Sequence, residues 1–349
     1  MAAISIVDLD DNKTDGVVKQ LDEAFSTVGF VYLTNHGIQQ ATIDSVLKAS
    51  KHFFQLPDDV KNQTRRDSSK DNDGYVGINQ EILGSNNLQE IKEAYNVTSS
   101  NSIFPSEELN PEFRSAVVSL ALELTELTKR LLTCMALALG LEDNFFVDRH
   151  RFMFQDQTKN ATTFRTLYYP SLAETHIEPG VVRCGAHSDY GTITLLLQDD
   201  VGGLQVLSGT EWISAVPIPG SILVNLGDLM QFWTAGRYTA TVHRVLVPEE
   251  EIRRKSTRQS IAFFVHPDND VMVSQLNGCN DHPPVGALDY LKTRLSATYI
   301  LPFLTGNHWQ IFFFRKRNLS LNFYFNCWFA VGLRDWIILP PKGKGLPSF

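Results

Sequence analysis

Two histidines and an aspartate are the residues of this chain whose types and spacing first suggest chemistry. His187 and Asp189 stand two residues apart in the segment Cys-Gly-Ala-His-Ser-Asp-Tyr-Gly, and side chains at that spacing point to the same face of a strand. An imidazole and a carboxylate aimed at one point can bind a divalent metal ion. A second histidine would complete a triad that suits Fe(II) and leaves further positions open. The candidate is His243, in Thr-Val-His-Arg-Val. These three residues are called the metal triad below.

An arginine and a serine after the triad could bind a carboxylate. Arg258 and Ser260 begin an apolar segment, Ile-Ala-Phe-Phe-Val, and the two-residue spacing places both on one strand face. A guanidinium group beside a hydroxyl can hold a carboxylate through charge-assisted hydrogen bonds. A lone His-x-Asp pair is more often part of a turn or a surface than of a metal site. The whole series in this order is much more specific.

This series resembles the site of the 2-oxoglutarate- and Fe(II)-dependent dioxygenases of the isopenicillin N synthase-like family. The resemblance covers about residues 3 to 299. The matching segments outside the site include Phe-Ser-Thr-Val-Gly-Phe at 25–30, Asn-His-Gly-Ile at 35–38 and Asn-Leu-Gly-Asp at 225–228.

The resemblance implies roles for the residues and a reaction. The metal triad would bind Fe(II), and Arg258, Ser260 and the hydroxyl of Tyr169 would bind the side carboxylate of the cosubstrate 2-oxoglutarate. Many relatives have Asn where Leu167 stands, so a polar contact near the oxo acid is lost. The enzyme would use O2, with ascorbate as reductant, to hydroxylate, desaturate or cyclise a small organic molecule, releasing succinate and CO2. The triad residues would act as ligands, and no general base is assigned.

Two alternatives remain open at this point. One is an Fe(II) oxidase of the same fold that needs no 2-oxoglutarate, which succinate release measured against oxygen uptake would distinguish. The other is a catalytically inactive jelly-roll binding protein. The intact triad and the Arg-x-Ser pair argue against the second alternative.

Composition restricts partners and compartment. The chain has 349 residues, 43% hydrophobic residues and a net charge of −8, which argues against a nucleic-acid surface. Its four cysteines form no Cys-x-x-Cys motif, as expected for free thiols in a reducing cytosol. The first residues lack the basic and apolar regions of a signal peptide. We therefore expect a cytoplasmic protein, a monomer, with no membrane and no nucleic-acid partner.

The hydrophobic pattern predicts an α+β fold, in which a helical amino-terminal domain packs on a double-stranded β-helix (jelly-roll) core. Helices are expected at 15–28, 40–54, 111–140 and 286–297, with one helical turn at 228–234. Residues 61–73 are charged and polar and predict a mobile loop. Gly202-Gly203 predicts a hairpin turn. The predicted strands are 4–7, 30–33, 164–169, 182–185, 193–197, 204–207, 212–215, 222–225, 241–246 and 259–265. The expected domains are 1–150, the non-haem dioxygenase amino-terminal domain, and 151–299, the catalytic jelly roll.

Other polar and aromatic residues receive mostly structural interpretations. His150 and His266 are expected to be packed or surface histidines, and Asp228 a turn or helix cap rather than a fourth ligand. Aromatic residues near strand ends belong more often to a core than to a pocket. Those that could line the substrate pocket are Tyr190, Trp233 and Phe264.

The last fifty residues differ from the rest in composition. Residues 300–349 contain six Lys or Arg residues and one Asp, are rich in Phe and Trp, and show no helical or strand period. The family resemblance ends before them. We favour a non-native carboxy-terminal extension, with a docked structural extension and a membrane or partner contact as the alternatives.

Overall fold

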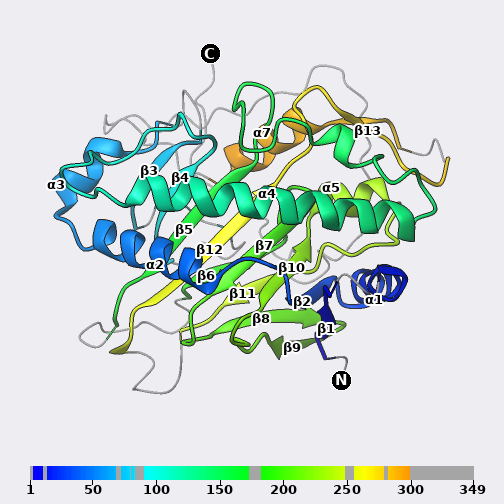
Figure 1. The fold of residues 1–349 in the computed structure, drawn as a ribbon, viewed down its shortest axis with the longest axis horizontal. Helices are drawn as coiled ribbons and strands as arrows, with labels where there is room; N and C mark the ends of the chain where they lie inside the picture. Colours follow the sequence, from blue (N-terminus) through cyan, green and yellow to red (C-terminus); the bar gives the residue numbers. More distant parts are fainter. Residues whose placement is uncertain are drawn as a thin grey trace, which may run out of the picture. The chain divides into compact units, whose positions relative to one another are not determined.

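An eight-stranded sheet and a four-stranded sheet form the frame that positions the candidate residues (Figure 1). The computed structural model describes residues 3–10, 14–67, 72–78, 80–81, 83, 90–172, 182–247, 255–278 and 282–298. All of them belong to one contact-defined unit, Met1–Leu301. The expectations for residues 300–349 lie outside the described residues.

The large sheet joins strands from both halves of the chain. All its neighbouring strands pair antiparallel except β1 and β2, which are parallel. Its order is β1 (Ser5–Asp8), β2 (Phe30–Thr34), β10 (Ile222–Leu226), β7 (Ile193–Gln198), β12 (Arg258–Val265), β5 (Thr163–Tyr169), β4 (Glu93–Val97) and β3 (Gly74–Val76).

The small sheet carries two of the three triad residues. Its order is β6 (Cys184–His187), β11 (His243–Val245), β8 (Leu204–Ser208) and β9 (Glu211–Ser214). A separate pair consists of β13 (Met272–Val273) and β14 (Val285–Gly286). The two facing sheets confirm the predicted jelly-roll core. The expected hairpin at Gly202-Gly203 is wrong, because β7 and β8 belong to different sheets. Both glycines have positive φ, 75° and 95°, in a turn that connects the sheets.

Helices from the amino-terminal part cover one face of the large sheet, and α4 crosses in front of it in Figure 1. The buried faces of these helices and the apolar side chains of β5, β7 and β12 share one hydrophobic core. The longer helices are α1 (Thr14–Thr27), α2 (Gln40–Phe54), α4 (Phe113–Ala138) and α7 (Ala287–Thr298). The short ones are α3 (Asp58–Lys61), η2 (Asn62–Thr64), η3 (Val147–Arg149) and α5 (Asp228–Trp233). In the part of the chain described here, no helix has the length and apolar character needed to cross a bilayer.

The predicted loop at 61–73 is partly wrong. Residues 58–64 form α3 and η2, and Lys61 is buried because its ammonium group pairs with the carboxylate of Glu93 on β4. The helical structure of this segment was not predicted, because a residue buried through an ion pair does not contribute to a hydrophobic pattern. Strands β3 and β4 were also not predicted.

Candidate active site

The metal triad comes together where the small sheet meets the large one. His187 is the last residue of β6 and His243 the first of β11, and the two are direct partners in the antiparallel register. Asp189 lies two residues beyond the end of β6 rather than on it, so the chain turns between the first two ligands. Asp189 Oδ1 is 3.8 Å from His187 Nε2 and 3.7 Å from His243 Nε2. These residues are the one cluster of possible metal ligands found among the described residues.

Backbone carbonyls orient both imidazoles. The Nδ1–H of His187 donates to the carbonyl of Gly185 at 2.8 Å, and that of His243 donates to the carbonyl of Thr241 at 3.1 Å. This tautomer leaves each Nε2 lone pair free to face Asp189, and such outer hydrogen bonds are typical of metal-binding histidines. The ring of Phe30 packs edge-on against His243, with centroids 5.5 Å apart. These contacts orient both histidine rings towards Asp189.

Asp189 is buried but held in its charged form. Its Oδ2 accepts a hydrogen bond of 2.6 Å from the side-chain amide of Asn225 on β10. Burial alone would raise its pKa, but His243, His187 and hydrogen bonds from Thr194 and Asn225 outweigh that effect and lower the pKa. Burial also lowers the pKa of His243 to about 4, so this imidazole is neutral at neutral pH. A neutral imidazole and an ionised carboxylate are the forms that bind metal.

The spacing of the three ligand atoms fits a first-row metal ion. Bonds of roughly 2.0–2.2 Å allow two ligand atoms to lie up to about 4.4 Å apart, and the measured separations of 3.7 and 3.8 Å are within that limit. Two nitrogens and one oxygen on one side of the ion match the facial triad of Fe(II) oxygenases.

Two glycines fix the backbone behind Asp189. The amide of Asp228 donates to the carbonyl of Asp189 at 2.8 Å, and the amide of Gly227 donates to that of Thr192 at 3.0 Å. A Cβ atom on Gly227 would collide with the carbonyl of Gly191, and one on Gly191 would collide with the carbonyl of Val265. Neither residue can carry a side chain without moving the turn that holds Asp189.

The Arg-x-Ser pair forms a second, buried polar centre. Arg258 is 1% exposed and is the register partner of Tyr169 on β5, whose ring centroid is 4.8 Å from the guanidinium carbon. Its nitrogens donate to the carbonyl of Gly202 at 2.9 Å, Ser260 Oγ at 3.2 Å and Gln198 Oε1 at 3.3 Å. No described carboxylate forms an ion pair with Arg258. This set of donors fits the carboxylate of a cosubstrate.

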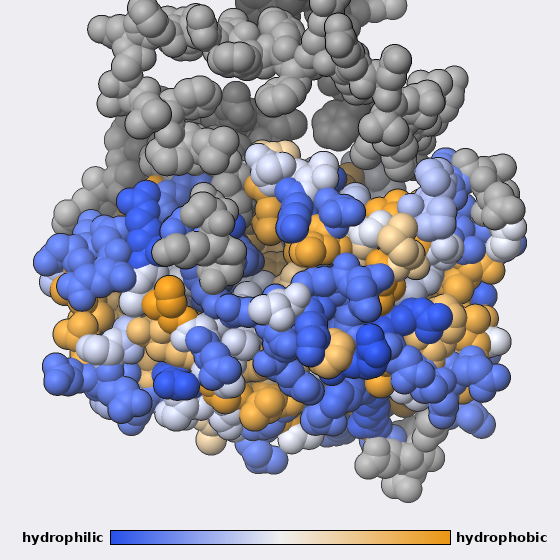
Figure 2. Space-filling model, turned by 90° about the horizontal axis from the view of Figure 1, so that it is seen from above, coloured by the Kyte–Doolittle hydropathy of each residue, from blue (hydrophilic) through white to orange (hydrophobic). Residues whose placement is uncertain are grey.

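A cavity opens beside the triad. It has a volume of about 590 Å³ including its open mouth, and His187 and Asp189 are part of its wall. Five aliphatic or aromatic residues also line it: Leu83, Tyr190, Phe264, Leu291 and Leu295. The face near α7 is hollowed at its centre, with hydrophilic and hydrophobic atoms around the hollow (Figure 2).

Helix α7 forms one side of this cavity. Tyr190 follows Asp189 in sequence, and its hydroxyl oxygen is 2.6 Å from Thr298 Oγ1. The guanidinium group of Arg294 stacks on the ring of Tyr190. Tyr290 and Arg294 also contact the carboxylate of Asp228 at 2.6 and 3.5 Å. Asp228 was expected to be a turn or helix cap, but the N-cap of α5 is Gly227 and Asp228 is the first residue of the helix. Its carboxylate also connects α5 with α7. These contacts were not predicted, because the two segments are far apart in sequence.

The aromatic and histidine predictions have mixed outcomes. Tyr190 and Phe264 line the cavity, whereas Trp233 packs on Phe146 in the core. His266 was expected to be an ordinary packed or surface residue, but it lines the cavity although it is only 6% exposed. Its place directly after β12, on which Arg258 lies, is the signal that could have indicated this.

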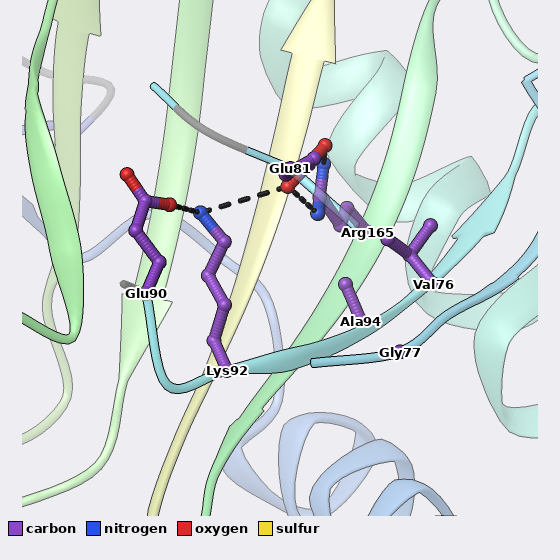
Figure 3. Close-up of a pocket in the computed structure, with 7 residues that line it drawn as sticks. All are labelled: Val76, Gly77, Glu81, Glu90, Lys92, Ala94 and Arg165. Atoms are coloured by element: carbon purple, nitrogen blue, oxygen red, sulfur yellow. Dashed lines mark hydrogen bonds and ion pairs between the residues drawn. The ribbon is translucent and has the colours of Figure 1, made fainter. Parts of the chain in front are cut away.

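A largely buried charged cluster lies beside the cavity, and Figure 3 shows it lining a separate, smaller pocket. Arg165 on β5 binds Glu81 through two bonds of 2.8 and 2.5 Å, and both residues line the cavity. Lys92 lies between Glu81, at 3.5 Å, and Glu90, at 2.6 Å. We call these four residues the charged cluster. Sequence reasoning missed it, although Arg165 is four residues before Tyr169 and so shares its strand face.

The charged cluster also supports the strand that ends at His187. Glu90 Oε1 accepts hydrogen bonds from the amides of Gly185 at 2.9 Å and Leu83 at 3.0 Å. Burial alone would lower the pKa of Lys92, but Cys184 and the two glutamates outweigh it and raise the pKa. The ammonium group therefore stays charged, and its positive charge stabilises the carboxylates of Glu81 and Glu90.

Family models match most of the described chain. The 2OG-Fe(II) oxygenase superfamily model matches residues 161–267, which include the triad and the Arg-x-Ser pair. The model for the non-haem dioxygenase in morphine synthesis N-terminal region matches residues 4–114.

Curated relatives and solved structures agree with these matches. The 2-oxoglutarate-dependent dioxygenase htyE of Aspergillus rugulosus is 31% identical, over 80% of this chain and 92% of the relative. A homoarginine-6-hydroxylase of Arabidopsis thaliana is 31% identical over 77% and 82%. The crystal structure of a full-length Neurospora crassa protein in complex with alpha-KG is 28% identical and superposes with a TM-score of 0.75, covering 84% of this chain and 96% of that one. These matches, together with the His-Asp-His triad, show that the chain belongs to the 2-oxoglutarate- and Fe(II)-dependent dioxygenases.

Proposed function

We propose that this dioxygenase binds Fe(II) through His187, Asp189 and His243. It binds the side carboxylate of 2-oxoglutarate through Arg258 and Ser260, with Tyr169 beside them. The observation that carries the proposal is the convergence of both histidine Nε2 atoms on one oxygen of Asp189, at the wall of a cavity.

Each part of the site has a separate task. When bound, the iron and 2-oxoglutarate would supply, with O2 as the oxidant, the chemistry that oxidises an unactivated C–H bond of the substrate. The triad holds one side of the metal and leaves the others open. Arg258 and Ser260 fix the far end of the cosubstrate, which sets its register. The apolar side chains of the cavity exclude water from the substrate.

The relatives do not fix the substrate. One is named for homoarginine, and the Neurospora crassa protein was also crystallised in complex with alpha-KG and thymine. Leu291 and Leu295 form an apolar part of the cavity wall, and Glu81 and Arg165 form a polar part. We therefore propose a small substrate that has an apolar portion facing the two leucines and a polar group near Arg165 and Glu81.

Compartment, assembly and domain division are further proposals. The spacing of the cysteines supports a cytoplasmic protein with free thiols, and the net charge of −8 supports the absence of a nucleic-acid partner. We propose that the protein is a monomer. We also propose the division into residues 1–150 and 151–299, although strands from both parts share the large sheet. Light scattering of the purified protein would test the monomer.

The test of the assignment is metal binding and turnover in triad variants. Asp189→Ala should lose stoichiometric Fe(II) in anaerobic titration and all succinate formation in a metabolite screen supplied with ascorbate. Full iron occupancy in this variant would contradict the assignment. Oxygen uptake without succinate in the wild-type enzyme would instead indicate the oxidase alternative.

A further inference from the structure

A second arginine lies buried near the Arg-x-Ser pair and is not explained by the site described above. Arg183, directly before β6, is 0% exposed. Its Nη2 donates to the carbonyl of Ser256 at 3.2 Å, whereas its Nε and Nη1 have no hydrogen-bond partner. No carboxylate of the described residues forms an ion pair with it. Burying a guanidinium group in this way is unfavourable unless something else supplies the negative charge.

Tyr169 connects Arg183 with the cosubstrate end of the site. The guanidinium carbon of Arg183 is 5.8 Å from the centroid of the Tyr169 ring, and that of Arg258 is 4.8 Å from it. The arginines repel each other: together with burial, Arg258 lowers the pKa of Arg183 to about 10. Arg183 still carries a full charge at neutral pH. Two guanidinium groups beside one buried ring need more negative charge than a neutral ligand would bring.

The acid that acts on both arginines is already engaged. Asp199 interacts electrostatically with Arg183 and Arg258. Its two oxygens, however, accept hydrogen bonds from the backbone amides of Val201 and Gln259. Among the described contacts it makes no ion pair with either guanidinium group. Asp199 therefore reduces the repulsion between the two arginines but accepts no hydrogen bond from the Nε and Nη1 atoms of Arg183.

We propose that Arg183 is a second cationic binding residue for the side carboxylate of 2-oxoglutarate, acting together with Arg258. This inference rests on the proposed function of Arg258 and Ser260. The cosubstrate brings the missing negative charge, so the unfavourable burial of Arg183 is offset when it binds. The buried positive charge therefore favours a cosubstrate that has two carboxylates over one that has a single carboxylate.

A purely structural role makes different predictions. If Arg183 only held the segment at Ser256, its removal would lower the melting temperature and weaken every 2-oxo acid equally. If it binds the side carboxylate, the loss depends on that carboxylate. Pyruvate has the 2-oxo acid group but no side carboxylate, and so separates the two roles.

The experiment measures binding, not turnover. Wild type, Arg183→Met, Arg183→Lys and Arg258→Met are titrated with 2-oxoglutarate and with pyruvate by calorimetry, in the Mn(II)-loaded protein. Arg183→Met should raise the Kd for 2-oxoglutarate about 10- to 100-fold, as expected for a hydrogen bond to a charged group. The Kd for pyruvate should change less than about twofold. Arg183→Lys keeps the charge, so its Kd for 2-oxoglutarate should lie between those of the wild type and Arg183→Met. Because an unpaired buried charge is removed, the melting temperature of cosubstrate-free Arg183→Met should not fall.

Arg149→Met is the matched control, because Arg149 also stacks on an aromatic ring, that of Phe145, but lies outside the site. It should leave both Kd values unchanged. An unchanged Kd for 2-oxoglutarate in Arg183→Met, or an equal loss for pyruvate, would overturn the inference. If Arg258→Met also leaves 2-oxoglutarate binding intact, the proposed function of Arg258 fails as well, and the two failures are distinguishable. If Arg183→Met does not fold, Arg183→Lys decides through the same comparison of 2-oxoglutarate with pyruvate.

Discussion

Replacement of Asn225 tests whether the surroundings of the triad, and not only its three ligands, determine metal affinity. Asn225 lies on β10 and donates its side-chain amide to Asp189 Oδ2 at 2.6 Å. It is 2% exposed, so no water can easily replace the lost bond. Asn225→Leu removes the donor and keeps a similar volume. Asp189 then has one oxygen facing the metal and one that is buried with a weaker set of donors.

The size of the effect follows from the charge of the acceptor. A hydrogen bond to a charged group contributes about 1.5–3 kcal/mol, and each 1.4 kcal/mol corresponds to about a factor of ten in a binding constant. Asn225→Leu should therefore weaken Fe(II) binding about 10- to 100-fold, which is also the usual effect of removing an outer hydrogen bond at a metal site. His187 and His243 keep their own carbonyl partners, so binding is weakened rather than abolished.

Anaerobic Fe(II) titration followed by calorimetry measures this loss directly. Asn144→Leu is the control, because Asn144 donates to Asp148 at 2.7 Å in an exposed pair far from the triad in sequence. It should bind iron as the wild type does. Unchanged iron affinity in Asn225→Leu would refute the reasoning, since it would show that the orientation of Asp189 does not depend on this bond.

Four further predictions follow from the same contacts. Arg258→Lys should weaken 2-oxoglutarate binding by about 1–3 kcal/mol in calorimetry, because an ammonium group cannot reproduce the guanidinium fork. Gly227→Ala should lower both melting temperature and iron occupancy, because its Cβ would collide with the carbonyl of Gly191. Burial lowers the pKa of His150 to about 4, so its share of stability, up to about 3 kcal/mol, should be lost as pH falls from about 6.5 towards 4; in urea titrations His150→Asn should flatten this dependence. A chain truncated after Tyr299 should bind Fe(II) and 2-oxoglutarate like the full chain, and a lower melting temperature or weaker binding would contradict the prediction.

The three triad residues come together as expected, but for a different reason than the one that predicted it. His187 and Asp189 were placed on one strand face, yet Asp189 lies beyond the end of β6. The turn between them brings the carboxylate to the histidines, and strand periodicity alone does not describe that turn. Arg258 and Ser260 do share a strand face, and there periodicity alone was sufficient.

The missed features have one physical origin. Lys61 and Lys92 are buried and Arg165 is partly buried, and each contacts a carboxylate eleven or more residues away in sequence. Hydropathy assigns such residues to the surface because it does not take account of distant partners. Arg183 is also buried, but none of the described carboxylates forms an ion pair with it, and only the positions of the side chains reveal this.

The backbone packs so closely around Gly191 and Gly227 that neither residue can carry a side chain. This close approach has a consequence for how new substrate preferences arise in this fold. The position of Asp189 is set by main-chain hydrogen bonds and by two residues that have no side chain. The far wall of the cavity is set by Leu291 and Leu295 on α7. Mutations of these two leucines can therefore reshape the cavity while the contacts of Tyr290, Arg294 and Thr298 near Asp189 are kept. Evolution, or a library restricted to Leu291 and Leu295, can explore many substrates while the metal triad stays intact.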